Sequence, residues 1–255
     1  MRRVLVAALS AVVFALPVRA DSGTATHQSD WSYEGDKGPE HWGDLDPAYR
    51  LCRDGTAQSP VDLKWSRPRA SLLNFHYMAS PLRVVDTGHT VQVNFKPGST
   101  VLIRGKRYNL LHVNFHSTSE HTISSRGYPV EAHFVHERGV GERAVVAVMF
   151  KEGRKNEAIE RIWSRIPKEK YKEAVHEGET INPMELIPRV HTRYYYIESL
   201  TTPPCTEGVS WFVLRTPITL SGDQRAAFRR VHDGNARPLQ PRHGRAVRHS
   251  AEPGE

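Results

Sequence analysis

The stretch Leu111-His112-Val113-Asn114-Phe115-His116-Ser117-Thr118-Ser119-Glu120-His121 decides the fold class, because its first six residues alternate between apolar and polar side chains. Successive side chains of a β-strand point to opposite faces, so His112, Asn114 and His116 share one face of the predicted strand. The apolar residues between them face the other side. The pattern therefore predicts a strand over residues 111–116 with a polar face and an apolar face.

Three further segments have the composition of strands. Residues 90–95 alternate with period two, and residues 209–214 form an apolar run. Residues 144–150 are almost entirely apolar, which is typical of a strand that is buried on both faces. Strands therefore dominate the middle of the chain.

Helical patterns are few. Residues 156–165 are amphipathic, and Ser221-Gly222-Asp223-Gln224 has the form of a capping box that begins a helix ending near Gly234. Residues 171–186 are charged and rich in turn formers. We predict a mainly β (α+β) fold, a single sheet-dominated domain with short peripheral helices.

The first twenty residues have the pattern of a secretory signal peptide. Arg2 and Arg3 precede an apolar run over residues 4–17, and Val18-Arg19-Ala20 ends in a small residue. A membrane anchor is the alternative, but the apolar run is short for a membrane span. We expect cleavage after Ala20, no remaining membrane span, and a soluble product in the periplasm or outside the cell.

Removal of 20 of the 255 residues leaves 235, enough for one large domain. We place this domain at residues 21–240 and a basic flexible tail at residues 241–255. Basic tails can bind anions, membranes or nucleic acid, but a solvated, mobile end is the favoured interpretation. The formal charge of +7 falls to +4 without Arg2, Arg3 and Arg19, and no basic stripe interleaved with aromatic residues indicates a nucleic-acid partner.

Cys52 and Cys205 are the two cysteines of the chain. An even number of cysteines in an exported protein favours a disulfide, with two buried free thiols as the alternative. Such a bond would close a loop of about 150 residues and stabilise the fold by a few kcal/mol.

Several residues could build a metal site. His116 and His133 are candidate ligands from two neighbouring strands, and Glu120 and Glu131 could fix their orientation. Three protein ligands with an open fourth position are typical of catalytic zinc. Thr201 follows a strand-like segment and could orient a metal-bound hydroxide. The alternatives are ordinary strand histidines and an ordinary turn that ends in proline.

Many short motifs occur in an order that identifies a family. They are Trp31-Ser32-Tyr33, Gly38-Pro39-Glu40-His41-Trp42, Gln58-Ser59-Pro60-Val61, Gly88-His89, Phe115-His116, Ser119-Glu120-His121, Glu131-Ala132-His133-Phe134-Val135-His136, Ser199-Leu200-Thr201-Thr202-Pro203-Pro204-Cys205, Glu207-Gly208-Val209-Ser210-Trp211, Asn235 and Arg237-Pro238. With these motifs the chain resembles the α-class carbonic anhydrases over nearly all of its mature length. The cysteines also lie where exported members of that family carry their disulfide.

This resemblance implies a large twisted, mostly antiparallel sheet and a zinc-dependent, reversible hydration of carbon dioxide to bicarbonate. It implies that Thr201 accepts a hydrogen bond from zinc-bound hydroxide and donates one to Glu120, and that His89 passes the proton to buffer. Glu131 would orient the zinc ligand His133, and Asn235 would lie behind the ligands. The apolar wall for carbon dioxide would consist of Val135, Val146, Leu200 and Trp211.

The chain departs from the family pattern at the metal site. Asn114 stands where the family has its first zinc histidine, and His112 stands where it usually has glutamine. An amide oxygen is a poorer zinc donor than imidazole. His112 lies two residues away, about 6–7 Å along the strand, and would need a changed rotamer to approach the metal.

Three interpretations remain open at this point. The chain is a carbonic anhydrase with a weak third ligand, a catalytically silent binding or interaction protein, or a site adapted to a different metal or hydrolytic reaction. The presence of Glu120, Thr201, His89 and the apolar wall favours the first. The sequence does not define an oligomeric state.

Overall fold

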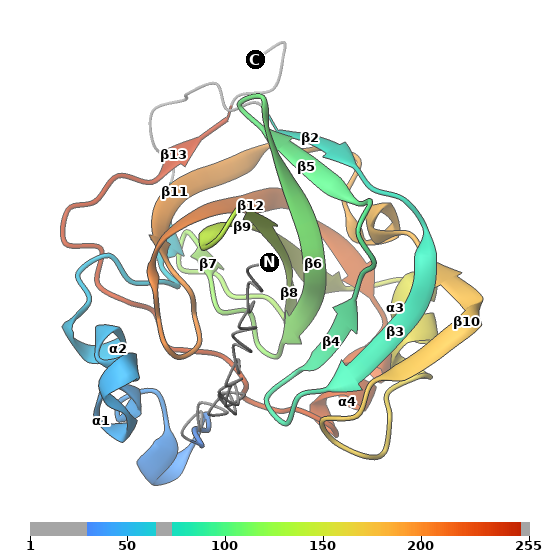
Figure 1. Ribbon diagram of the computed structural model, residues 1–255, viewed down its shortest axis with the longest axis horizontal. Coiled ribbons are helices and arrows are strands. Elements are labelled where there is room, and N and C mark those ends of the chain that lie inside the picture. Colours follow the sequence, from blue (N-terminus) through green and yellow to red (C-terminus); the bar gives the residue numbers. More distant parts are fainter. Residues whose placement is uncertain (1–29, 65–72, 251–255) are drawn as a thin grey trace, which may run out of the picture.

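The computed structural model describes residues 30–64 and 73–250 (Figure 1). The predicted signal peptide lies outside the described residues. No helix within the described ranges is long and apolar enough to cross a membrane.

One large sheet forms the body of the protein (Figure 1). Its strands are β2 (Leu73–His76), β3 (Ser80–Asp86), β4 (Val91–Asn94), β5 (Thr100–Ile103), β6 (Lys106–His116), β8 (Val130–Arg138), β9 (Glu142–Glu152), β10 (Ala174–Ile181), β11 (Arg193–Ser199), β12 (Glu207–Leu220) and β13 (Arg248–His249). A separate two-stranded sheet pairs β1 (Asp62–Leu63) with β7 (Thr122–Ile123). The prediction of a sheet-dominated domain is confirmed.

The strand order of the large sheet is β10-β3-β4-β6-β8-β9-β12-β11-β13, and β5 pairs with both β2 and β6. Neighbouring strands are antiparallel except for β9 and β12, which run parallel. The sheet is strongly curved, with β6, β8, β9 and β12 in the middle of the view and β10 toward one side (Figure 1). A mostly antiparallel, twisted sheet is therefore the fold that the resemblance implied.

Strand β9 shows how the central strands are buried on both faces. Ala144, Val146, Val148 and Phe150 belong to the larger apolar cluster, and the residues between them belong to a second cluster on the opposite face. Every residue from 144 to 150 is buried, as the apolar run predicted. Burial of this much apolar surface is the main favourable contribution to folding.

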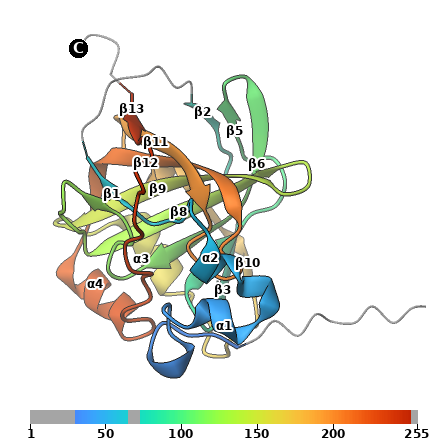
Figure 2. The same ribbon diagram turned by 90° about the vertical axis from the view of Figure 1, so that its left-hand side faces the viewer.

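The helices are short and peripheral. They are α1 (Trp42–Leu45), α2 (Leu51–Asp54), α3 (Glu157–Trp163) and α4 (Gly222–Arg229), with 3₁₀ turns η1 (Gly35–Lys37), η2 (Pro47–Tyr49) and η3 (Pro183–Leu186). Helices α1 and α2 lie next to each other (Figure 2), on the opposite side of the molecule from α3 (Figure 1). The capping box predicted at Ser221 is present, because Ser221 accepts from the main chain of Gln224 while the Gln224 side chain accepts from that of Ser221. The helix ends at Arg229, five residues before the predicted Gly234, and Arg230 is its C-cap.

Two segments form strands that the sequence analysis did not predict. Residues 171–186 contain the strand β10, whose mostly exposed side chains lack the apolar alternation by which strands are recognised. Residues 241–250, expected to be a flexible tail, instead pair β13 with β11 and bury Val247. The Arg245 side chain also pairs with the buried Glu198 carboxylate at 3.0 Å. Both contacts join the tail to residues that are distant in the sequence, so composition alone does not reveal them.

Candidate metal centre

The candidate ligands come together through the register of three neighbouring strands. Asn114 of β6 is paired with His133 of β8, and His133 is paired with Ala147 of β9. One row further along, His112 is paired with Val135, and Val135 with Val145. The polar face predicted for residues 111–116 therefore lies against the strand that carries His133.

Hydrogen bonds fix the orientation of both imidazole rings. His116 Nδ1 donates to the main-chain oxygen of Asn235 at 2.8 Å, and His133 Nε2 donates to Oε1 of Glu131 at 2.8 Å. The two ring centroids lie 4.4 Å apart. Because one nitrogen of each ring carries the donated proton, His116 Nε2 and His133 Nδ1 keep lone pairs with which they could bind a metal.

Asn114 lies beside this pair. Its Nδ2 atom is 3.1 Å from Nε2 of His116, and its Oδ1 atom is buried without a hydrogen-bond partner among the described residues. A half-turn of the amide would exchange these two atoms and bring the oxygen to the histidine nitrogen. Neighbouring ligand atoms of a tetrahedral zinc site lie roughly 3.3 Å apart. The arrangement therefore fits a zinc ion held by two histidines and one amide oxygen.

Glu120 lies beneath the two histidines and is 2% exposed. Its Oε1 atom accepts a 2.8 Å hydrogen bond from the main-chain nitrogen of Arg237 and lies 3.6 Å from His116 Nδ1. Its Oε2 atom lies 3.8 Å from His133 Nδ1 and accepts no hydrogen bond within the part of the chain that the structure describes. The hydrogen bond expected from Thr201 is thus not formed, although Thr201 is buried and lines a cavity together with Asn114 and His133.

The surroundings shift the pKa values of His116 and His133 in opposite directions. Burial lowers the pKa of His116, and the nearby Glu120 charge only partly offsets this. Burial also acts to lower the pKa of His133, but the charge and hydrogen bond of Glu131 outweigh it, so this pKa is raised. Burial acts to raise the pKa of Glu131, yet the charges of His121 and His133 bring it well below its ordinary value. Glu131 therefore stays an anion and holds the rings of His121 and His133.

His121 and Tyr196 complete this buried network and were not among the predicted site residues. His121 Nδ1 is 2.6 Å from Oε1 of Glu131, and its Nε2 is hydrogen-bonded to the hydroxyl of Tyr196. The motif Ser119-Glu120-His121 contains the available signal for His121. A role for Tyr196 could not be read from sequence, because it depends on which side chains of β11 lie on the face of the sheet that carries Trp211.

A cavity of about 350 Å³ opens beside Asn114 and His133. Its lining residues are Leu111, His112, Asn114, His133, Val135, Arg143, Val145, Leu200, Thr201, Thr202, Pro203, Pro204 and Trp211. Val135, Leu200 and Trp211 were predicted to line it. Val146 was predicted wrongly, because it lies in the larger apolar cluster on the opposite face of β9, and Val145 lines the cavity instead.

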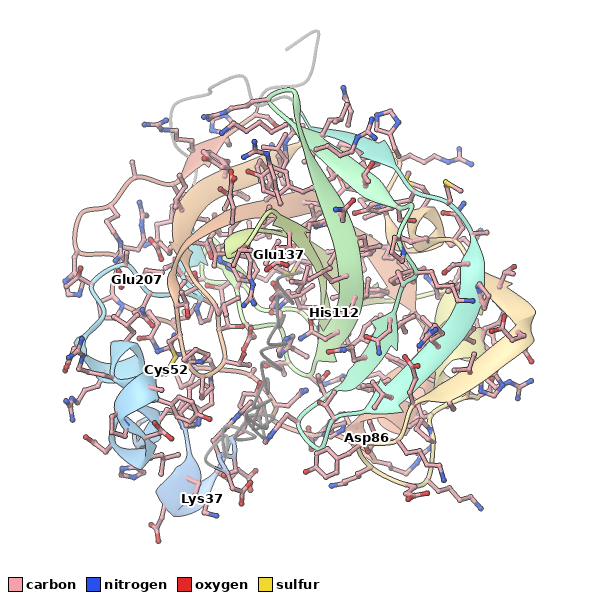
Figure 3. The ribbon with its side chains drawn as sticks, in the orientation of Figure 1. Lys37, Cys52, Asp86, His112, Glu137 and Glu207 are labelled. Carbon is pink, nitrogen blue, oxygen red and sulfur yellow. A yellow bond between two sulfur atoms is a disulfide. The ribbon has the colours of Figure 1, made fainter. Side chains whose placement is uncertain are left out.

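His89 and His112 lie further from the candidate ligands. His89 is stacked on Trp31 with ring centroids 3.7 Å apart, and burial lowers its pKa. The main-chain oxygen of His89 accepts from Nδ2 of Asn235, which connects this turn to His116. His112 projects from β6 (Figure 3), and burial followed by the charge of Arg143 lowers its pKa to about 4. Two groups of described residues place potential metal ligands close together, and neither includes His112. They are His116, Glu120 and His133, and His121, Glu131 and His133.

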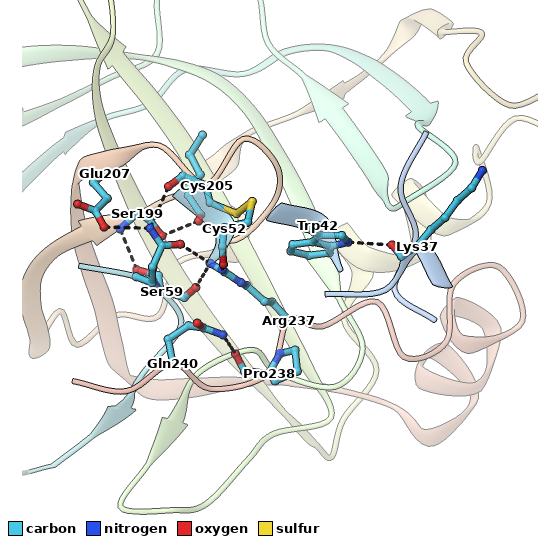
Figure 4. Close-up of a disulfide and its surroundings, with 12 residues drawn as sticks. Lys37, Trp42, Cys52, Ser59, Ser199, Cys205, Glu207, Arg237, Pro238 and Gln240 are labelled. Carbon is cyan, nitrogen blue, oxygen red and sulfur yellow. Dashed lines mark hydrogen bonds between the residues drawn. A yellow bond between two sulfur atoms is a disulfide. The ribbon is translucent and has the colours of Figure 1, made fainter. Parts of the chain in front are cut away.

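The predicted disulfide between Cys52 and Cys205 is present, with its Cα atoms 5.0 Å apart (Figure 4). Cys205 follows the cavity residues Thr201–Pro204, and Cys52 belongs to α2. Arg237 joins this region to the candidate site. Its Nη2 atom donates to the main-chain oxygen of Cys52 at 3.1 Å, and its main-chain nitrogen donates to Glu120.

Comparison with known proteins decides the family. The model of the family described as eukaryotic-type carbonic anhydrase matches residues 37–251. The chain belongs to this family. It is 36% identical over 230 residues to a carbonic anhydrase of Pectobacterium carotovorum, an alignment that covers 89% of this chain and 94% of the relative.

Solved structures agree with this assignment. The α-carbonic anhydrase of Thermovibrio ammonificans in complex with the inhibitor sulfanilamide superposes with a TM-score of 0.83 at 40% identity, over 86% of this chain and 99% of that one. Dioscorin complexed with ascorbate superposes with a TM-score of 0.80 at 32% identity, over 89% of this chain and all of that one, 100%. The carbonic anhydrase fold therefore extends through the whole sheet described above.

Proposed function

We propose that this chain is a carbonic anhydrase, a lyase that catalyses the reversible hydration of carbon dioxide to bicarbonate and a proton. The observation that carries the proposal is that the rings of His116 and His133 lie with centroids 4.4 Å apart beside Asn114, and that Asn114 and His133 line the cavity. We assign His116 and His133 as the principal zinc ligands and Asn114 as a weak third one. As is known for carbonic anhydrases generally, zinc lowers the pKa of water to about 7 and so supplies hydroxide near neutral pH.

The remaining residues would bind and orient the reactants. Asn235 and Glu131 hold the two ligand rings by the hydrogen bonds described above. Val135, Val145, Leu200 and Trp211 offer an apolar wall that suits uncharged carbon dioxide. Thr201 could orient the attacking oxygen once its hydroxyl donates to the unpartnered Oε2 of Glu120. That bond would fill the one acceptor atom of Glu120 for which the described residues offer no donor.

His89 is the candidate proton carrier. It lies at the turn before β4 and is half-buried against Trp31, so its ring is reachable from solvent. Because its pKa is lowered, the ring is mostly neutral at neutral pH and can accept a proton from the site. Release to buffer would then complete each turnover.

Metal analysis combined with kinetics tests the proposal. The exported chain should contain zinc after purification without added metal, and stopped-flow measurements should show hydration of carbon dioxide that the variant His116→Ala lacks. A matched control is His76→Ala, which removes an exposed histidine of β2 and should change neither property. A wild-type chain that is folded and loaded with zinc yet inert would refute the proposal.

A second candidate function is that of a silent binding protein. The hydrogen bond between Asn114 Nδ2 and His116 Nε2 favours it, because it engages the nitrogen that would bind metal. Dioscorin, with 32% identity, was solved with ascorbate, so a relative of this fold can bind an organic anion. Absence of bound zinc, together with saturable binding of ascorbate in the apo chain, would favour this alternative.

We further propose that the protein is exported to the periplasm or the cell exterior. The disulfide between Cys52 and Cys205 supports this location, because disulfides persist in oxidising compartments. Fractionation of cells that produce the full chain, followed by N-terminal sequencing of the mature product, tests both the location and the expected cleavage after Ala20.

A further inference from the structure

The cavity carries one permanent charge that the proposed chemistry of carbon dioxide does not require. Among the described residues that line it, Arg143 alone has a side chain that is positively charged at every physiological pH. Carbon dioxide is uncharged, whereas bicarbonate is an anion. A cation in the wall therefore distinguishes between the two reactants.

The register of the sheet places Arg143 at the outer end of the cavity. Arg143 precedes Val145 by two residues on β9, and Val145 is paired with Val135 of β8. Side chains two residues apart lie on one face, about 6–7 Å apart along the strand. Arg143 is thus the next residue above the apolar wall on the face that carries His133 and Ala147.

Arg143 has spare hydrogen-bonding capacity. Within the part of the chain that the structure describes, its guanidinium makes one hydrogen bond, from Nε to Oε1 of Glu137 at the long distance of 3.5 Å. Its side chain is 40% exposed and that of Glu137 is 29% exposed. Glu137, labelled in Figure 3, lies on β8 and is paired with Arg143 of β9. The terminal nitrogens of Arg143 could therefore donate to a further anion.

Two other basic residues lie near the cavity but do not line it. Arg83 and Lys96 line a neighbouring hollow that shares Leu111 and His112 with the cavity. Arg83 binds both oxygens of Glu173, and Lys96 lies 3.6 Å from Glu177. Among the described residues, Arg143 is the one arginine or lysine in the cavity wall, and its ion pair is long.

We propose that Arg143 is a specificity-determining residue that binds bicarbonate at the mouth of the cavity. A guanidinium matches a planar oxyanion with two parallel N–H donors, and the apolar wall below it strengthens the contact by excluding water. Glu137 opposes this binding and limits its strength, which allows bicarbonate to leave. The inference deepens the proposed function, because it concerns the anionic reactant of the same site.

Binding and kinetic measurements on full-length variants test this proposal. Isothermal titration with sodium bicarbonate at constant ionic strength should show binding that is roughly three- to tenfold weaker in Arg143→Leu than in wild type. Arg143→Lys should retain most of the affinity, and Glu137→Gln should increase it. The matched control is Arg138→Leu, which removes an exposed arginine that pairs with Glu142 and does not line the cavity.

The kinetic signature follows from the fixed equilibrium constant of the reaction. In concentrated buffer, where proton transfer does not limit turnover, an Arg143 that holds bicarbonate but not the transition state has a clear signature: Arg143→Leu raises KM for bicarbonate and kcat of dehydration by the same factor, while kcat/KM stays unchanged. KM for carbon dioxide should also stay unchanged. A merely structural effect would instead lower kcat/KM in both directions.

The possible outcomes separate this inference from the proposed function. Bicarbonate binding that depends on Arg143 in a chain without turnover would refute the enzyme and leave the anion site standing. Wild-type turnover with bicarbonate affinity unchanged in Arg143→Leu would overturn the anion site and leave the enzyme. Equal weakening in Arg138→Leu and Arg143→Leu would reduce the effect to net charge and overturn the proposal, as would a wild-type chain that binds no bicarbonate.

Discussion

Nδ2 of Asn114 lies 3.1 Å from Nε2 of His116, on the same face of β6. The two side chains are therefore close enough to share one metal ion, but an amide oxygen donates to zinc less strongly than an imidazole nitrogen. Asn114→His should raise zinc affinity, by roughly 10- to 100-fold. The hydration rate should rise with it.

The residue at position 112 affects how well the new histidine at position 114 is oriented. A neighbouring side chain orients a new ligand by a hydrogen bond, and the neutral His112 is less suited to that task than a glutamine. The double variant His112→Gln with Asn114→His should therefore exceed the single one in both zinc binding and rate. Competition with a chromogenic chelator measures the affinity, and stopped flow measures the rate. If wild type already binds zinc tightly and neither variant is faster, Asn114 does not weaken the site.

His89→Ala should slow hydration in dilute buffer, by roughly 10- to 100-fold, because proton transfer then lacks its carrier. Added imidazole should restore most of the rate. The matched control, His76→Ala, removes an exposed histidine from β2, which lies away from the described cavity. An unchanged rate for His89→Ala in dilute buffer would leave His89 as no more than a ring packed on Trp31.

The sequence predicted the polar strand face and its partner strand because alternation is a local property. Asn114 and His116 share a face by spacing alone, and the motif around His133 supplied the second strand. The error at Val146 has the opposite origin. In a run where every residue is apolar, the sequence does not show which residues face the cavity. The pairing of Val135 with Val145 determines which side chain lines it.

Contacts between distant segments escaped prediction for a related reason. The hydrogen bond from the main chain of Arg237 to Glu120 and the network around Tyr196 depend on tertiary packing, which a motif does not encode. The same holds for residues 241–250. Their basic composition is typical of a mobile tail, yet Arg245 meets Glu198 and Val247 is buried.

Removing the disulfide should destabilise the protein. Cys52 and Cys205 are separated by 153 positions, and a crosslink across so long a loop restricts the unfolded chain strongly. The double variant Cys52→Ala with Cys205→Ala should lose about 2–5 kcal/mol of unfolding free energy. Urea unfolding of this variant against the oxidised wild type measures the loss. Equal stability of the two proteins would mean that the bond contributes nothing to the fold.

Glu198 should make the stability of the protein depend on pH. Its side chain is 2% exposed, and burial raises its pKa to about 7, although Arg245 partly opposes the shift. The ordinary pKa of a glutamate is about 4.3. Between these two values the folded state binds more protons than the unfolded state, so the contribution of Glu198 to stability falls as pH rises through this window.

Glu198→Gln removes this dependence by keeping the group neutral. The unfolding free energy of the variant minus that of wild type should therefore be larger at about pH 8 than at about pH 5. The change in this difference between the two pH values should reach up to about 3 kcal/mol. Urea unfolding of both proteins at both pH values measures it. Glu177→Gln is the matched control, since Glu177 is largely exposed beside Lys96 and should show no such difference. A Glu198→Gln effect that is the same at both pH values would mean that Glu198 remains charged in the folded protein throughout, held by Arg245.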